Sequence, residues 1–320
     1  MKILNQLKQS LEKSQFKLTF FSSESNFDWD KKIFSIKDAK LFFSKNQVLY
    51  EREYYKTKDD FVFIIENEFK YYIFKIFIKD SDVIIFSPFI SNKFDYTLGL
   101  KINKIIYSFT KSLDLNIRIN ILPRVDTLTE NFKILFSSIF NIESSYDMYV
   151  DLTLSENDLW KSLRKSYKSL INSALKQIVF KNEIDEKDFI LCKNFHHIIA
   201  GRKTRSDETW KLQYESIQKG ESKILMAFDC EKDFLGFSLF NIGDYTVSYS
   251  VGVYDRDRFK NLAISHALIW KSILYFKESY KELYLGNSSY KKEIIDKKLK
   301  NINYFKMGFC NKIHTNSYLF

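Results

Sequence analysis

The hydrophobic and polar positions of this chain alternate in short runs that predict a succession of strands and helices. The clearest run extends from Tyr245 to Trp270 and reads YTVSYSVGVYDRDRFKNLAISHALIW. Its first part is rich in β-branched and aromatic residues, which favours a strand. The charged stretch 255–258 interrupts this pattern, and apolar residues then recur at the spacing of a helix. We therefore predict a strand, a polar turn and a helix.

Further strands are predicted on both sides of this segment. The runs 221–229 and 234–240 flank the polar stretch DCEKD, and they predict two paired strands that form a meander with the strand after Tyr245. A short strand is predicted at 283–286. The basic stretch 291–300 predicts a helix before the motif Phe305-Lys-Met-Gly-Phe309.

The first half of the chain shows the same mixture of elements. Three strands with polar breaks are predicted at 61–65, 71–78 and 83–86. Helices are predicted at 98–113 and 132–140, with a strand at 117–122 between them. The fold class is therefore α/β (α+β), with mixed, mostly antiparallel sheets flanked by helices. We find no catalytic constellation in this half.

A helix with an apolar stripe and a basic face is predicted after Ser155, which begins a capping-box-like sequence. The basic face has two interpretations: a solvated surface, or a face that binds phosphates through charge-assisted hydrogen bonds. The stripe consists of Leu159, Leu163, Tyr167, Leu170 and Ala174, and the opposite face carries Lys161, Arg164, Lys165, Lys168 and Asn172.

Composition and charge narrow the possible functions. The formal net charge is +10, which suits a polyanionic or phosphate-bearing partner and also suits simple solubility. The three cysteines are scattered without a C-x-x-C pair, so we expect no disulfide framework and a reducing compartment. Adjacent His196 and His197 do not share a helix face, so we expect no metal site. No apolar run reaches the ~20 residues that span a bilayer, and we expect a cytoplasmic protein.

The order of motifs in the second half resembles the catalytic half of the FemAB-like transferases, which consist of two domains with the acetyltransferase (GNAT) fold. The basic loop Gly201–Arg205 and the basic stretch 165–176 fit the same family. The residues that carry the resemblance are Tyr249, Gly252, His266, Trp270, Leu285-Gly286 and Phe305-Lys306-Met307-Gly308-Phe309.

This resemblance implies two tandem GNAT-like domains, a degenerate one over residues 1–150 and a catalytic one over 151–320. Each domain is expected to form its own sheet, and the two sheets to face a shared cleft. The resemblance also implies that Lys306 lies at the active site and stabilises developing negative charge or an acceptor phosphate. Tyr249 matches the strand tyrosine of the family and is the second candidate catalytic residue. A core role for Tyr249 and a snorkelling Lys306 are the structural alternatives.

The remaining candidate residues are basic or lie in the turn after the Tyr249 strand. In acetyltransferases this turn carries R/Q-x-x-G-x-G/A, whose amides hold the coenzyme A pyrophosphate, and here Asn261 replaces the first glycine. His266 could be a base by its spacing, but helix packing is the favoured role. The expected substrate-binding residues are Arg164, Lys165, Lys168, Arg202, Arg205, Arg258 and Asn261.

Three functions remain open at this point. The first is a transferase that moves an acyl or aminoacyl group onto an amine of a cell-envelope or glycan precursor, by direct attack in a ternary complex. The second is an acetyl-CoA-dependent N-acetyltransferase that acts on an amino sugar or nucleotide-sugar. The third is a non-catalytic RNA- or nucleotide-binding protein. No cofactor is expected beyond the donor, acetyl-CoA or aminoacyl-tRNA, and the expected partners are a phosphate-bearing acceptor and tRNA.

Neutralising the basic face tests its role directly. Replacement of Lys165 and Lys168 by Gln should weaken the binding of total tRNA and flatten its dependence on salt, because fewer counterions are released. Filter binding at several salt concentrations measures the slope. An unchanged slope would show that this face is only solvated.

Overall fold

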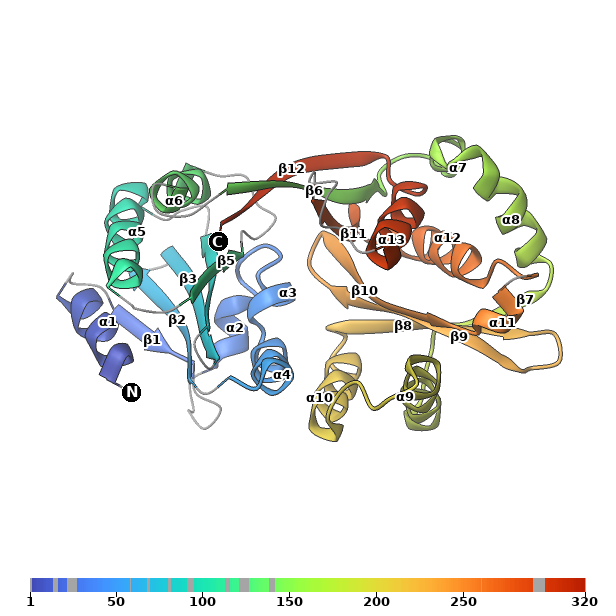
Figure 1. Cartoon of the computed structure of the whole chain (residues 1–320), viewed down its shortest axis with the longest axis horizontal. Helices are drawn as coiled ribbons and strands as arrows, with labels where there is room; N and C mark the ends of the chain where they lie inside the picture. Colours follow the sequence, from blue (N-terminus) through green and yellow to red (C-terminus); the bar gives the residue numbers. More distant parts are fainter. Residues whose placement is uncertain are drawn as a thin grey trace. The chain divides into compact units, whose positions relative to one another are not determined.

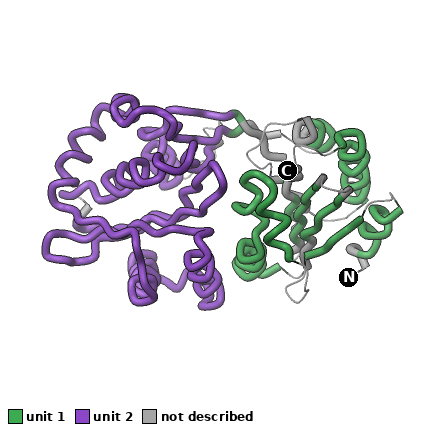
Figure 2. Tube along the Cα trace, turned by 180° about the vertical axis from the view of Figure 1, so that it is seen from behind, with its two compact units in different colours: residues 1–145, 289–291, 315–320 green, residues 146–288, 292–314 purple. Residues whose placement is uncertain are grey.

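The computed structural model describes residues 2–13, 17–21, 28–57, 59–67, 70–79, 82–90, 95–112, 116–120, 127–137, 142–259, 261–289 and 297–319. The chain divides into two compact units (Figure 2). Unit 1 comprises residues 1–145, 289–291 and 315–320, and unit 2 comprises residues 146–288 and 292–314. Boundaries between the units fall inside three strands, after residues 145, 288 and 314.

Unit 1 begins with a helix, α1 (Lys2–Glu12), and continues through a strand, three helices and a three-stranded meander. A helix, a strand, a helix and a last strand complete the series. The elements are β1 (Lys17–Phe20), α2 (Trp29–Ile33), α3 (Lys40–Phe43), α4 (Lys45–Tyr55), β2 (Asp59–Asn67), β3 (Lys70–Lys79), β4 (Asp82–Ile90), α5 (Tyr96–Lys111), β5 (Asn116–Asn120), α6 (Thr127–Ser137) and β6 (Ile142–Asp151).

Unit 2 repeats this order after two connecting helices, α7 (Glu156–Ser162) and α8 (Lys165–Leu175). A short helix, α11 (Arg256–Phe259), is inserted after the meander. The repeated elements are β7 (Ile178–Lys181), α9 (Glu186–Ala200), α10 (Asp207–Gln218), β8 (Ser222–Asp229), β9 (Phe234–Ile242), β10 (Thr246–Tyr254), α12 (Ile264–Lys277), β11 (Glu282–Ser289), α13 (Lys297–Met307) and β12 (Lys312–Leu319).

The two series are therefore an internal structural repeat. In each, the meander is antiparallel and its third strand pairs in parallel with the strand that follows the next helix, β4 with β5 and β10 with β11. A parallel pair needs a crossover connection, and α5 and α12 supply it. The α/β fold class and the mostly antiparallel strands predicted from the sequence are confirmed.

The last strand of each series pairs with strands of the other series. The hydrogen-bonded order is β1-β2-β3-β4-β5-β12-β6-β11-β10-β9-β8-β7, so β12 follows β5 and β6 follows β11. Leu319, near the end of the chain, pairs with Ile119 of β5. The expectation that each domain forms its own sheet is wrong, because β6 and β12 join the strands into a single order.

Alternation along the strands builds a core on each face of the sheet. In β2, Phe63 and Ile65 belong to a cluster with α1, α5 and α6, whereas Val62 and Ile64 belong to a cluster with α2, α3 and α4. Unit 2 follows the same rule, with α8 and α12 on one face of the meander and α9 and α10 on the other (Figure 1). Because these strands are buried on both faces, their sequences are nearly continuous runs of apolar residues.

The structure corrects the predicted helix over residues 159–174. It consists of two helices, α7 and α8, separated by extended backbone at Leu163 and Arg164. Leu170, a member of the predicted apolar stripe, is 41% exposed, and the neighbouring Ile171 is buried instead. The break arises from a distant contact, because the backbone N–H of Arg164 donates to the carbonyl of Gly308.

A buried ion pair in unit 1 yields a stability prediction. Lys75 is fully buried on β3, and its Nζ donates to Oε2 of Glu51 on α4 at 2.5 Å and to the Phe42 carbonyl at 2.6 Å. Lys75→Met leaves the carboxylate buried without its cation and should cost about 3–5 kcal/mol in the free energy of unfolding. Adding Glu51→Gln should restore most of this loss in urea titrations. A single variant as stable as the parent would contradict this account.

Candidate functional site

Strands β10 and β11 stay paired for only three residues. Their register runs from Thr246↔Glu282 to Ser248↔Tyr284, although both strands continue, to Tyr254 and Ser289. The register of β10 against β9 shifts between Tyr249 and Val251, and such a bulge bends a strand and increases its twist. Backbone groups of Tyr249 and Gly286 thus lie where the described parts of the two strands are no longer paired to each other.

The side chain of Lys306 lies at this point of separation. Its Nζ is 5.7 Å from the centre of the Tyr249 ring on β10. A Cβ atom at Gly286 on β11 would lie only 2.6 Å from the same nitrogen. Gly286 also has φ of 115°, a conformation that favours glycine. The glycine therefore leaves room for the ammonium group between the two strands.

The environment of Lys306 is apolar for a cation. Burial lowers the pKa of its ammonium group below the ordinary value. Within the described residues its Nζ has no hydrogen-bond acceptor and no carboxylate partner, and it lies over the face of the Tyr249 ring. A cation placed in this way is energetically costly, and an anionic or carbonyl group would relieve the cost.

Tyr249 is held in one orientation on the bulged strand. Its hydroxyl lies over the Cα of Gly252, where a Cβ atom would clash with it, and it is hydrogen-bonded to the buried Ser238. Burial raises the pKa of the phenol above its usual value, so the hydroxyl stays protonated at neutral pH. Tyr249 can thus act as a hydrogen-bond donor or a cation–π partner, but not as a base.

Residues of the α8 N-terminus contact the last turn of α13, which carries Lys306. Nη2 of Arg164 donates to the Tyr304 carbonyl at 2.9 Å, and the Tyr167 hydroxyl donates to the Phe305 carbonyl at 3.1 Å. The guanidinium also stacks on the Tyr304 ring, 3.7 Å from its centre. Arg164 is therefore engaged with α13.

An aromatic cluster encloses His266 on α12. Its ring lies edge-on to Tyr167 and Phe305, with centres 4.4 and 5.0 Å apart, and 6.0 Å from Phe309. Burial, with a smaller contribution from Arg164, lowers the pKa of His266 to about 4. His266 is thus a neutral packing histidine at pH 7, which agrees with the favoured interpretation of the sequence.

Solved structures share this arrangement of elements. The crystal structure of FemX aligns with a TM-score of 0.64 at 11% identity, over 95% of this chain and 96% of FemX. L-PGS from Bacillus licheniformis aligns with a TM-score of 0.54 at 12% identity, over 78% of this chain and 80% of the L-PGS chain. No protein-family model and no curated protein matches the chain in sequence. The chain has the FemX fold.

The C-terminal domain of a putative lysylphosphatidylglycerol synthetase from Agrobacterium fabrum has the same architecture. It aligns with a TM-score of 0.57 at 9% identity, over 98% of this chain and 91% of that domain. At these identities the likeness concerns the fold. The FemAB-like fold expected from the motif order in the second half is confirmed at this level.

In the second repeat of this FemX-like chain, the cation of Lys306 lies where the two parallel strands separate. By element order, β4, β5 and α6 of unit 1 correspond to β10, β11 and α13. The described side chains of these elements include Ile85, Ile119 and Phe136, which are buried together in one apolar cluster. These three side chains of unit 1 thus pack in an apolar core, whereas the corresponding elements of unit 2 surround Lys306.

The contacts of the other predicted binding residues, among the described residues, do not include Lys306. Lys165 is exposed at the start of α8, and Lys168 donates to the Lys161 carbonyl at 3.2 Å. Arg202 is exposed, and the guanidinium of Arg205 packs on Trp210 at 4.9 Å in the loop between α9 and α10. Their role in substrate binding stays a prediction.

The turn after β10 is occupied by its own contacts. Arg258 pairs with Asp229 at 2.5 Å and with Asp233 at 2.7 Å, so it would have to leave both carboxylates to bind a substrate. The amides of Asp257 and Arg258 donate to Oδ1 of Asp255. The amide of Asn261 donates to the Arg258 carbonyl, and its side chain is exposed.

Several residues of the site were not predicted from the sequence. Ser238 supports Tyr249, and Nδ2 of Asn303 donates to Oγ of Ser288 at 2.5 Å, which ties α13 to β11 one turn before Lys306. Single polar residues in apolar strands are the available signal for Ser238 and Ser288. Nothing in the sequence pairs them with their partners.

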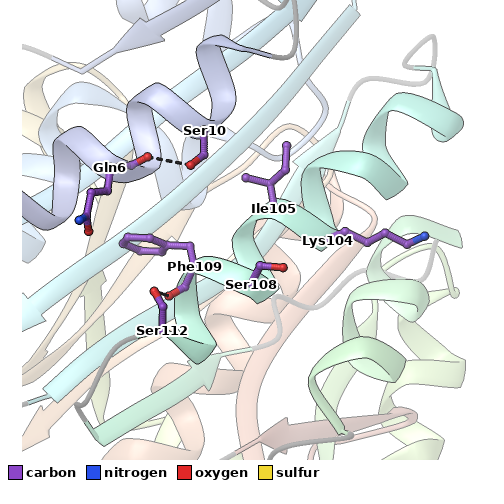
Figure 3. A pocket seen from close by; sticks show the side chains of 7 residues that line it. All are labelled: Gln6, Ser10, Lys104, Ile105, Ser108, Phe109 and Ser112. Carbon is purple, nitrogen blue, oxygen red and sulfur yellow. Dashed lines mark hydrogen bonds between the residues drawn. The ribbon is translucent and has the colours of Figure 1, made fainter.

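A cavity in unit 1 contains none of the predicted residues. Its volume is about 530 Å³, and side chains of α1 and α5 line it (Figure 3). The hydroxyls of Ser10 and Ser112 donate to carbonyls of their own helices, so they do not form a built site. The lining residues are Gln6, Ser10, Lys104, Ile105, Ser108, Phe109 and Ser112.

Two further properties bear on the expectations from the sequence. Within the described ranges, no group of three or more His, Cys, Asp or Glu side chains is arranged to hold a metal ion. None of the helices there combines the length and the apolar character needed to cross a bilayer.

The neutral state of His266 makes stability depend on pH. Its pKa is about 4 in the folded chain against 6.5 ordinarily, and His196 is lowered in the same way by burial. Between these values the unfolded chain binds more protons, so the stabilisation is complete above pH 6.5 and is lost as pH falls toward 4. Each histidine contributes a slope of up to about 1.4 kcal/mol per pH unit.

Replacing the histidine by an aromatic residue tests this assignment. His266→Phe should flatten the fall in the free energy of unfolding between pH 6.5 and 4, and the slope due to His196 should remain. Urea titrations at pH 7, 6 and 5 measure the difference. A variant with the parent's slope would show that His266 is already protonated or exposed in the fold.

Proposed function

We propose that this chain is a transferase that moves an acyl or aminoacyl group onto an amine. The proposal rests on one observation: the cation of Lys306 lies between two separating strands, half-buried and without an anionic partner among the described residues. A preorganised positive charge in a poorly solvated place stabilises negative charge that develops during a reaction. Its location in the second repeat of a FemX-like fold supports the same function.

The reaction needs no covalent enzyme intermediate. The acceptor amine attacks the carbonyl carbon of the donor ester or thioester, and a C–N bond forms while the carbonyl oxygen gains negative charge. The C–O or C–S bond then breaks, the leaving oxygen or sulfur takes the electron pair, and the amine releases a proton. The ammonium of Lys306 would stabilise the carbonyl oxygen, and Tyr249 would hold the ammonium in place through its ring.

The turn after β10 favours an aminoacyl ester over acetyl-CoA as the donor. A coenzyme A pyrophosphate requires free backbone amides at this turn. The amides of Asp257 and Arg258 are engaged by Asp255, and those of Asn261 and Leu262 by the Arg258 carbonyl. Aminoacyl-tRNA is therefore the donor that we propose.

The acceptor that we propose is an amine-bearing precursor with a phosphate, diphosphate or nucleotide, as in cell-envelope or glycan synthesis. The formal net charge of +10 and the exposed Lys165 and Arg202 of unit 2 suit such a partner. One neighbour in structure is described as the C-terminal domain of a putative lysylphosphatidylglycerol synthetase, a name that combines an aminoacyl group with a phosphate-bearing lipid. The reaction would take place in the cytoplasm.

Removing the charge of Lys306 tests the proposal. Lys306→Met keeps the aliphatic stem and should lower the rate by ~10²–10³ with little change in Tm, because one preorganised charge is lost. The assay follows radiolabel from mixed aminoacyl-tRNAs to an amine-bearing nucleotide-linked glycan precursor, with labelled acetyl-CoA in a parallel reaction. Lys300→Met, at an exposed position of the same helix, is the matched control and should keep the parent's rate.

Two results would count against this assignment. One is a rate for Lys306→Met within a few-fold of the parent. The other is a fall in Tm large enough to explain the lost activity, which would make Lys306 a structural residue. Labelling from acetyl-CoA alone would replace the proposed donor.

A further inference from the structure

The last turn of α13 has an unusual set of partners. The last four carbonyls of a helix have no intrahelical donor, so they need others. The amide of Phe309 donates to the Lys306 carbonyl at 3.0 Å. The carbonyl of Tyr304 accepts from Nη2 of Arg164. The carbonyl of Phe305 accepts from the Gly308 amide at 3.1 Å and also from the Tyr167 hydroxyl. Side chains from the start of α8 thus join the backbone amides of Gly308 and Phe309 in closing the end of the helix that carries Lys306.

Arg164 and Tyr167 act on this turn as a connected pair. Nη1 of Arg164 donates to the Tyr167 hydroxyl at 2.9 Å, and this hydroxyl in turn donates to the Phe305 carbonyl. The guanidinium also carries its positive charge to the negative end of the α13 dipole, a favourable place for a cation. One planar group therefore binds a carbonyl, a hydroxyl and the Tyr304 ring at the same time.

The backbone of the two segments is locked as well. Arg164 is the N-cap residue of α8, and its N–H donates to the Gly308 carbonyl at 2.9 Å. The Tyr167 ring occupies the position that a Cβ atom at Gly308 would need. One turn earlier in α13, Asn303 is bonded to Ser288 of β11. The helix that carries Lys306 is thus tied to both α8 and β11.

We propose that Arg164 and Tyr167 are positioning residues, which fix the last turn of α13 so that the ammonium of Lys306 stays between Gly286 and Tyr249. Arg164 then serves the active site through α13 and is not a ligand of a substrate phosphate. The consequence for activity rests on the proposed function, whereas the placement of Lys306 does not.

The test measures the placement of Lys306 without any substrate. The chain is treated with acetic anhydride over a range of pH, and peptide mass spectrometry measures the acetylation of each lysine. The labelling midpoint is the pH at which the acetylation of a given lysine reaches half of its maximum. In the parent, Lys306 should have a lower midpoint than exposed lysines. In the Arg164→Ala variant the side chain of Lys306 should enter water, and the labelling midpoint of Lys306 should rise to that of the exposed lysines. Lys176→Ala, an exposed position at the end of α8, should leave the midpoint of Lys306 unchanged.

Two conservative variants separate positioning from folding. Tyr167→Phe keeps the ring that packs on Gly308 and His266 and removes only the hydroxyl, so the midpoint of Lys306 should rise with little change in Tm. Arg164→Lys keeps the charge but cannot bind Tyr304 and Tyr167 together, so it should not restore the parent's midpoint. If Arg164→Ala does not fold, Tyr167→Phe decides the question.

An unchanged midpoint for Lys306 in folded Arg164→Ala and Tyr167→Phe would overturn the proposal. A parental labelling midpoint for Lys306 in Arg164→Lys would also overturn the proposal, because a positive charge at position 164 would then be enough to place Lys306. If the parent catalyses transfer, Arg164→Ala should lower kcat by up to ~10² and leave KM nearly unchanged, since misplacement affects the reacting step. A parent without transfer activity but with the expected midpoints would refute the proposed function and leave the positioning role intact.

Discussion

The site depends on one physical constraint: a lysine ammonium must fit between two strands that have just separated. Lys306 reaches this place because β10 and β11 pair for only three residues and because Gly286 has no side chain. A half-buried cation carries a desolvation cost, which the fold tolerates with the Tyr249 ring and the side-chain-free Gly286 beside it. The contacts of Tyr249 with Gly252 and Ser238, and of Asn303 with Ser288, become intelligible as the support of this single group.

The internal repeat explains where that support comes from. Both repeats form a meander, a crossover helix and a parallel strand, and each last strand is inserted beside the other repeat's strands. In unit 1, the described side chains of the corresponding elements include Ile85, Ile119 and Phe136, which are buried in one apolar cluster. In unit 2, aromatic rings around His266 provide the packing and the parallel strands leave room for a charge. One scaffold is thus used once for stability and once for a candidate reaction.

The sequence predicted what local patterns determine. The strand, turn and helix after Tyr245 follow from periods of two and 3.6 residues, and the order of motifs identified the FemAB-like fold. Long-range contacts escaped prediction. The break at Arg164 depends on α13, whose Tyr304 lies 140 residues further along the chain. Likewise, no local signal reveals that β6 and β12 are exchanged, or that Arg258 is already paired with Asp229 and Asp233.

The most direct measurement is a crystal structure of the chain with an aminoacyl-adenosine analogue in which a stable amide replaces the reactive ester. The account predicts that the carbonyl oxygen of the analogue lies within hydrogen-bond distance of the Lys306 Nζ, at roughly 3 Å. Binding of the analogue only in the cavity between α1 and α5, or with Lys306 turned away from its carbonyl, would contradict the assignment of the active site.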